Sequence, residues 1–187
     1  MKKPNNFENT QCIGDFETLE AGAYKCKILQ AEECTASNGK EFIKLSFDIV
    51  EGDKKDFYKR KYTNDTRTDK KWSGVMTIFA EDYEGNTNRY FKTLITCAEE
   101  SNSGYKFDFD KVANLKDKKI GIVFREEEFI DSMKQIKTTV KPFRACNYDK
   151  TEEQKIPNKK QISDDKKEAL FETTFNSIPS NNDDMPF

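Results

Sequence analysis

The clearest pattern in the chain is an alternation of apolar and polar residues over residues 41–51. Four apolar residues recur at every second position: Ile43, Leu45, Phe47 and Ile49. This period predicts a strand with one buried face, and the opposite face carries Phe42 and Lys44. A turn signal at residues 37–40 separates it from an earlier alternating stretch, residues 23–33, which predicts a preceding strand.

Residues 56–63 also alternate, although neither face is plainly apolar. One face carries Tyr58, Arg60 and Tyr62, and the other carries Phe57, Lys59 and Lys61. We interpret this stretch as a third strand. Residues 75–79 fit either a short strand or the start of a helix.

A change of period predicts one helix over residues 88–99. Its apolar residues fall at helical spacing and form one stripe: Phe91, Leu94, Ile95 and Ala98. Residues 118–125 then predict a strand with Ile120, Ile122 and Phe124 facing inward, and residues 135–148 predict a last, long strand.

The expected order is three strands, a helix and two strands. A five-stranded OB-fold barrel has this order, with its helix between strands 3 and 4. An immunoglobulin-like sandwich would need about seven strands and no central helix. We therefore expect a mainly β protein in four parts. These are an N-terminal arm (1–20), an OB-fold domain (21–148), a flexible acidic tail that begins as a tether with a short helix (149–180), and an acidic tip (181–187).

Composition supports a modest core with solvated segments. Hydrophobic and charged residues each make up 35% of the chain, and the mean hydropathy is -0.92. The net charge of -2 conceals an uneven distribution, because residues 54–72 hold eight basic and three acidic residues. Residues 149–187 hold six lysines and nine acidic residues. This separation predicts a basic binding surface and an acidic tail.

Several function classes lack their signatures. No apolar run follows the first residues, and no stretch is long enough to cross a membrane, so we expect a cytoplasmic protein. The five cysteines show no paired spacing and the chain has no histidine, which predicts reduced thiols and no zinc or other cofactor. Phosphate-binding glycine loops are missing, so we expect no enzyme. A metal-dependent nuclease that uses the acidic residues at 108, 110 and 126–128 is a minor alternative.

Aromatic and basic residues gather where a single nucleic-acid strand could bind, because bases stack on rings within a basic groove. Tyr58, Arg60 and Tyr62 would share one strand face, although both tyrosines could instead belong to the core. Trp72 follows two lysines in a loop. The candidate DNA-binding residues are Phe42, Lys44, Tyr58, Arg60, Tyr62, Lys70, Lys71, Trp72, Arg125 and Lys141.

The C-terminal tip has a composition that a folded core does not need. Its residues are Asp183, Asp184, Met185, Pro186 and Phe187. A ring flanked by carboxylates suits a partner pocket that is apolar inside and basic at its rim. Pro186 lowers the ordering cost of binding, because its ring fixes one backbone dihedral angle.

Four segments resemble a family of small phage and mobile-element proteins of Gram-positive bacteria, considered OB-fold single-stranded DNA-binding proteins. They are Leu-Glu-Ala-Gly-Ala-Tyr at 19–24 and the stretches 40–51, 91–105 and 115–129. The resemblance covers roughly residues 19–148. The tip is similar to that of bacterial single-stranded DNA-binding proteins, where it docks replication, recombination and repair proteins.

These resemblances imply a protein that coats single-stranded DNA and recruits replication and recombination proteins through Asp183–Phe187. The tether contains Lys and Asn where the cellular family has Gly or Gln, and the loop before the helix is longer. We therefore expect a monomer or dimer in place of the tetramer of that family. The alternative is an interaction adaptor on a β-barrel that binds no nucleic acid.

Overall fold

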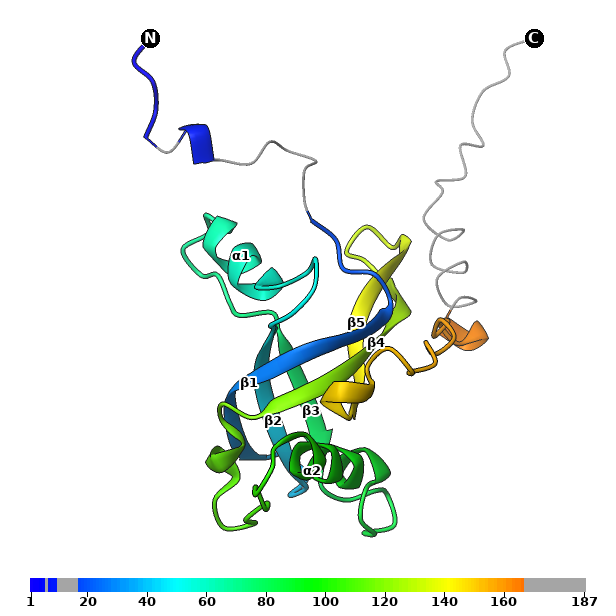
Figure 1. The fold of residues 1–187 in the computed structure, drawn as a ribbon. Helices are drawn as coiled ribbons and strands as arrows, with labels where there is room; N and C mark the ends of the chain where they lie inside the picture. The colour runs from blue at the N-terminus through cyan, green and yellow to red at the C-terminus, as the bar shows by residue number, and fades with distance from the viewer. Residues whose placement is uncertain (6, 10–16, 167–187) are drawn as a thin grey trace, which may run out of the picture.

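The computed structural model describes residues 1–5, 7–9 and 17–166. Its centre is one antiparallel sheet of five strands in the order β3-β2-β1-β4-β5 (Figure 1). The strands are β1 (Gly22–Thr35), β2 (Glu41–Ile49), β3 (Val75–Phe79), β4 (Lys119–Ile130) and β5 (Ile136–Cys146). The mainly β class is confirmed, and the sheet is open because β3 and β5 are its two edge strands.

Between residues 17 and 163, two α-helices accompany the sheet. They are α1 (Phe57–Asn64) and α2 (Arg89–Ser101), and three short 3₁₀ helices are η1 (Phe7–Asn9), η2 (Val112–Leu115) and η3 (Tyr148–Lys150). The predicted stripe of α2 is confirmed: Phe91, Leu94, Ile95 and Ala98 are buried. This face packs against β3, β4 and β5 at one end of the sheet (Figure 1). The side chain of Asn88 caps the helix by accepting a hydrogen bond from the amide of Tyr90.

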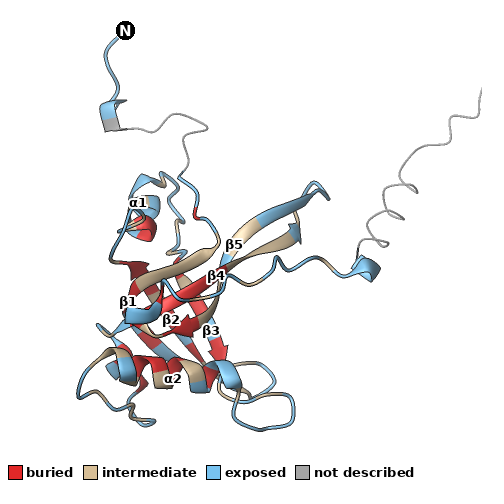
Figure 2. Cartoon of the chain, turned by 45° about the vertical axis from the view of Figure 1, so that its right-hand side comes forward, coloured by how far each residue is buried: buried red, intermediate tan, exposed pale blue. Residues whose placement is uncertain are grey.

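The period-two pattern correctly predicted the buried faces of the central strands. Ile43, Leu45, Phe47 and Ile49 of β2 are all buried, as are Ile120, Ile122 and Phe124 of β4 (Figure 2). Residues 75–79 form β3, which settles the alternative left open by the sequence. This segment is the third strand along the chain and lies at one edge of the sheet.

The prediction of a strand over residues 56–63 is wrong, because this stretch is helix α1. A helix gathers Phe57, Tyr58 and Tyr62 on one side, whereas either face of a strand would have buried a basic residue beside the rings. Asp48 of β2 holds the start of this helix. Its carboxylate accepts hydrogen bonds from the amides of Tyr58 and Lys59, each at 3.0 Å.

Gly74 allows α1 to pack closely on the sheet. A Cβ atom at this position would lie 2.4 Å from the carbonyl oxygen of Phe47 and 2.8 Å from the ring of Tyr58. The glycine therefore permits a close approach between β2, the start of β3 and α1.

The folded unit extends past Tyr148, where the sequence placed its end. Lys160 donates its amide to the carbonyl of Glu126 and accepts from the amide of Glu128, both at 2.9 Å. These bonds cover the edge of β4 that β1 leaves free, because β1 pairs only as far as Phe124. Lys160 thus contacts the sheet beyond the boundary that the sequence predicts at residue 148. Residues 167–180 of the predicted tether and the tip lie outside the described residues.

Candidate nucleic-acid interface

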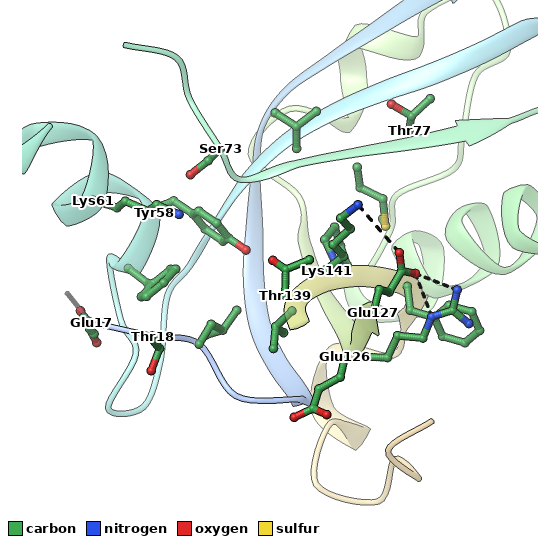
Figure 3. A pocket seen from close by; sticks show the side chains of 18 of the residues that line it. Glu17, Thr18, Tyr58, Lys61, Ser73, Thr77, Glu126, Glu127, Thr139 and Lys141 are labelled. Carbon is green, nitrogen blue, oxygen red and sulfur yellow. Dashed lines mark hydrogen bonds and ion pairs between the residues drawn. The ribbon is translucent and has the colours of Figure 1, made fainter. Parts of the chain in front are cut away.

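A groove of about 1680 Å³ lies between α1 and the far part of the β4–β5 hairpin (Figure 3). Its lining also includes residues of β3, the first turn of α2, the arm residues 17–19 and, after α1, residues 65–67 and 73. In Figure 1 the arm, drawn in blue, passes between α1 and the hairpin. The groove thus lies at the side of the sheet where its two edge strands come near each other.

Both edge strands turn unpaired backbone groups toward this groove. The bond from the amide of Ala80 to the carbonyl of Glu41 fixes the pairing register of β3. The backbone groups of Thr77 and Phe79 therefore point away from β2. The register of β5 on β4 likewise turns the backbone groups of Val140 away from β4. Pro142 also lies at this free edge, where the lack of an amide proton costs no hydrogen bond of the sheet.

Aromatic rings line the groove from several elements: Phe57, Tyr58, Phe79, Tyr90 and Phe143. Tyr90 is 43% exposed and meets Phe143 edge-on, with ring centroids 5.5 Å apart. The guanidinium of Arg125 lies 4.1 Å above the centroid of the Phe143 ring. Tyr90, Phe143 and Arg125 therefore form an aromatic and cationic platform of the kind on which bases stack.

Of these rings, sequence reasoning named only Tyr58 as a site residue and missed Phe57, Phe79, Tyr90 and Phe143. One signal was present for Tyr90, which lies outside the apolar stripe of its helix and so had no expected core contact. Phe79 and Phe143 carried no such signal, because an aromatic residue in a strand is ordinarily a core residue.

The groove contains cations and carboxylates in nearly equal number. The cations are Arg60, Lys61, Arg67, Arg125 and Lys141, and the acids are Glu17, Asp65, Glu126 and Glu127. Arg67 pairs with Asp65 at 2.6 Å and holds the pKa of that carboxyl at about 2. Arg60 pairs with Glu17 at 2.8 Å, and its hydrogen bonds lower the pKa of Glu17. The basic groups are thus present but largely neutralised by partners within the chain.

The predicted DNA-binding residues fall into three places. Tyr58, Arg60, Arg125 and Lys141 line the groove. Phe42 and Lys44 lie on the exposed face of β2, opposite Phe79 and Thr77 of β3, and the rings of Phe42 and Phe79 are 5.4 Å apart. Tyr62, Lys70 and Trp72 form a separate cluster, and Lys71 is exposed beside it.

Two of the predicted stacking residues are largely occupied by the fold. Tyr58 is 5% exposed and packs edge-on against Phe47, and burial raises the pKa of its hydroxyl. Only its hydroxyl end points toward the groove (Figure 3). Trp72 is half-buried, and its indole nitrogen donates to the carbonyls of Phe47 and Gly74 at 3.2 Å. The expected shared strand face of Tyr58, Arg60 and Tyr62 does not exist, since these residues lie on a helix.

The protein is therefore a mainly β protein whose open antiparallel sheet carries a groove lined with rings and charges. Residues 5–81 match the family described as "Protein of unknown function (DUF669)". That span runs through β1, β2, α1 and β3. No curated protein matches the chain. Within the described residues, none of the helices has the length and apolar character that a membrane span requires.

Proposed function

We propose that this protein binds single-stranded DNA in the groove between α1 and the β4–β5 hairpin. The observation that carries the proposal is the exposed Tyr90 ring, which packs edge-on against Phe143 beside Arg125, inside a groove that also holds Arg60, Lys61 and Lys141. Rings that accept base faces and cations that accept phosphates are the two requirements for binding a single strand.

The proposal includes an OB-fold. An OB-fold pairs its first strand with the second and fourth, and its barrel closes between the third and fifth strands. The order β3-β2-β1-β4-β5, with α2 between β3 and β4, is consistent with this arrangement. The groove occupies the gap between β3 and β5. An OB-fold would thus present its exposed β2–β3 face, with Phe42 and Lys44, beside the groove.

The proposal also assigns the C-terminal tip, Asp183–Phe187, to recruitment of replication or recombination proteins. This part rests on the sequence: an apolar ring flanked by carboxylates suits a basic-rimmed pocket on a partner. The division of labour is a groove that holds the DNA and a separate segment that holds the partner.

A titration of labelled oligo-dT, followed by fluorescence anisotropy, tests the groove. Tyr90→Ala should weaken binding by about 5- to 150-fold, which corresponds to about 1–3 kcal/mol for one stacked base. The matched control is Tyr83→Ala, because Tyr83 is a fully exposed ring that does not line the groove. Circular dichroism of both variants checks that the fold is kept.

Equal affinities of the parent, Tyr90→Ala and Tyr83→Ala for oligo-dT would contradict the assignment of the groove. Binding should also weaken steeply as salt rises, because phosphate contacts release counterions from the DNA. Addition of Mg²⁺ to the same mixtures tests the nuclease alternative, for which strand cleavage is the expected sign.

One observation favours a second function, an adaptor that binds an extended peptide. The backbone groups of Thr77, Phe79 and Val140 point toward the groove from two free sheet edges, and a peptide strand could pair with either. In that case the protein would not bind oligo-dT at any salt concentration, and Tyr90→Ala would have no DNA phenotype.

A further inference from the structure

Two carboxylates in the groove are each held between two cations. Glu17 of the arm pairs with Arg60 at 2.8 Å and with Lys54 at 3.4 Å. Glu127 of β4 pairs with Arg125 at 2.8 Å and with Lys141 at 3.9 Å. Figure 3 shows Glu17 and Glu127 on opposite sides of the groove, the second with its contacts dashed.

Each arrangement has the chemistry of a phosphate site. A guanidinium binds the two oxygens of a carboxylate or of a phosphodiester in the same forked geometry, and a nearby ammonium adds a point charge. The guanidinium of Arg60 contacts both oxygens of Glu17, at 2.9 and 2.8 Å through Nη2. Arg125 donates from Nε and Nη2 to a single oxygen of Glu127, Oε1, while it lies over the ring of Phe143, and Lys141 lies 3.9 Å from the other oxygen.

We propose that Glu17 and Glu127 occupy the positions at which two phosphates of the bound strand are held. This inference rests on the proposed binding of single-stranded DNA and adds where the backbone contacts lie. The strand would run across the groove, from the Arg60–Lys54 pair at α1 to the Arg125–Lys141 pair at the hairpin. The second pair is next to the Phe143–Tyr90 platform, so a base attached there can stack.

The carboxylates would act as competitors of the DNA. The side chains of the Arg60–Glu17 pair are 42% and 35% exposed, and exposed ion pairs contribute little to stability. The side chains of the Arg125–Glu127 pair are only 20% and 18% exposed, and a phosphate that displaces Glu127 replaces one anion with another, so the guanidinium is not left unpaired. Displacement leaves a carboxylate close to a phosphate, which lowers the affinity. The intact chain would therefore bind more weakly than a chain whose cations are unpaired, and it would release fewer counterions per contact.

The chain offers a matched control for each position. Glu126 also lines the groove and forms no ion pair among the described contacts, so Glu126→Gln removes the same charge without freeing a cation. The control for Glu17→Gln is Glu20→Gln, because Glu20 lies three residues further along the arm and does not line the groove.

The experiment is a titration of labelled oligo-dT over a series of NaCl concentrations. Glu127→Gln and Glu17→Gln should each raise the affinity about 3- to 10-fold at low salt, well above the rise in Glu126→Gln and Glu20→Gln. Their salt dependence should be steeper by about one phosphate contact. Affinities of Glu127→Gln and Glu17→Gln that equal those of their controls, or lie below the parent, would overturn the inference.

A second readout uses inorganic pyrophosphate as a probe that carries no base. It should raise the melting temperature of Glu127→Gln and Glu17→Gln more than that of the two control variants. If the parent failed to bind oligo-dT while pyrophosphate still stabilised these two variants selectively, the DNA function would be wrong and the phosphate positions would stand. If the parent bound oligo-dT and pyrophosphate showed no selectivity, the phosphate positions would be wrong.

Discussion

Asp48 illustrates how a single buried carboxylate positions one side of the groove. It is 5% exposed, and its oxygens accept hydrogen bonds from the amides of Ile49, Tyr58 and Lys59 at 2.9–3.0 Å. Two of these amides belong to the first turn of α1, which has no capping side chain of its own. The carboxylate therefore takes the place of an N-cap and ties the helix to β2.

Asp48→Ala should lower the free energy of unfolding by about 2 kcal/mol, because it leaves buried amides without acceptors. Urea unfolding followed by circular dichroism measures this loss. Asp48→Asn should lose less, since its amide oxygen can still accept from one amide. Asp53→Ala, an exposed residue of the preceding turn, is the control. A loss in the control as large as that in Asp48→Ala would contradict the assigned role.

Glu17 gives a pH dependence whose sign follows from its pKa. The hydrogen bonds from Arg60 lower the pKa of Glu17 in the folded state. The contact therefore stabilises the fold fully above the unfolded pKa of about 4.3, and the stabilisation disappears as the pH falls through the lower folded value. The stability difference between the parent and Glu17→Gln should be constant from pH 8 to 5 and shrink below that. A difference that persists unchanged to pH 2 would contradict this account.

Residue patterns predicted core positions better than site positions. Ile43, Leu45 and Phe124 were correctly predicted as buried because burial follows from the period of a strand. The groove rings Phe79 and Phe143 were not predicted, because residues so distant in sequence meet only through the fold. Their part in the groove depends on which strand edges are free, and a single strand's sequence does not encode that.

At the scale of elements, residue patterns predicted four of the five strands and α2, but not α1. Residues 56–63 place rings together with basic side chains on both faces that a period of two would give, so neither face is apolar. A period of two without an apolar face is weak evidence for a strand, because a strand of a sheet normally buries one face. The interaction that decides for a helix, the capping of Tyr58 and Lys59 by Asp48, comes from another element and is not local in sequence.

The segment after η3 should contribute measurably to stability. Thr151 is buried, Gln154 accepts a hydrogen bond from Arg144, and Lys160 bonds to β4 on its free edge. A chain that ends at Tyr148 should therefore be less stable than one that ends at Asp164 by at least about 2 kcal/mol, from several lost hydrogen bonds. Thermal unfolding compares the two. Equal melting temperatures would show that the segment adds nothing to the fold.

At the scale of the whole molecule, charge is divided between the sheet domain and the tail. Residues 54–72 are basic and residues 149–187 are acidic. Many of the cations near the groove already have carboxylate partners, so the net field is weaker than the sequence count suggests. Binding should depend on these local pairs more than on the total charge, which is nearly neutral.

Deletion of residues 181–187 should separate the two proposed activities. Affinity for oligo-dT should stay unchanged or rise slightly at low salt, since the removed carboxylates repel DNA. Capture of a replication or recombination partner should be lost, and Phe187→Ala alone should cause much of that loss because the ring fills the partner's pocket. Pull-down with a matched Asn181→Ala control measures it. Loss of DNA binding with intact partner capture would invert the assignment.

The most direct test of the central claim is to locate the bound strand by ultraviolet cross-linking of oligo-dT to the full chain. Peptide mass spectrometry then identifies the linked residues. The account predicts cross-links at Phe79, Tyr90 and Phe143, which line the groove. Cross-links confined to Tyr83 or Phe109, exposed rings outside the groove, would show that DNA binds elsewhere and would contradict the account.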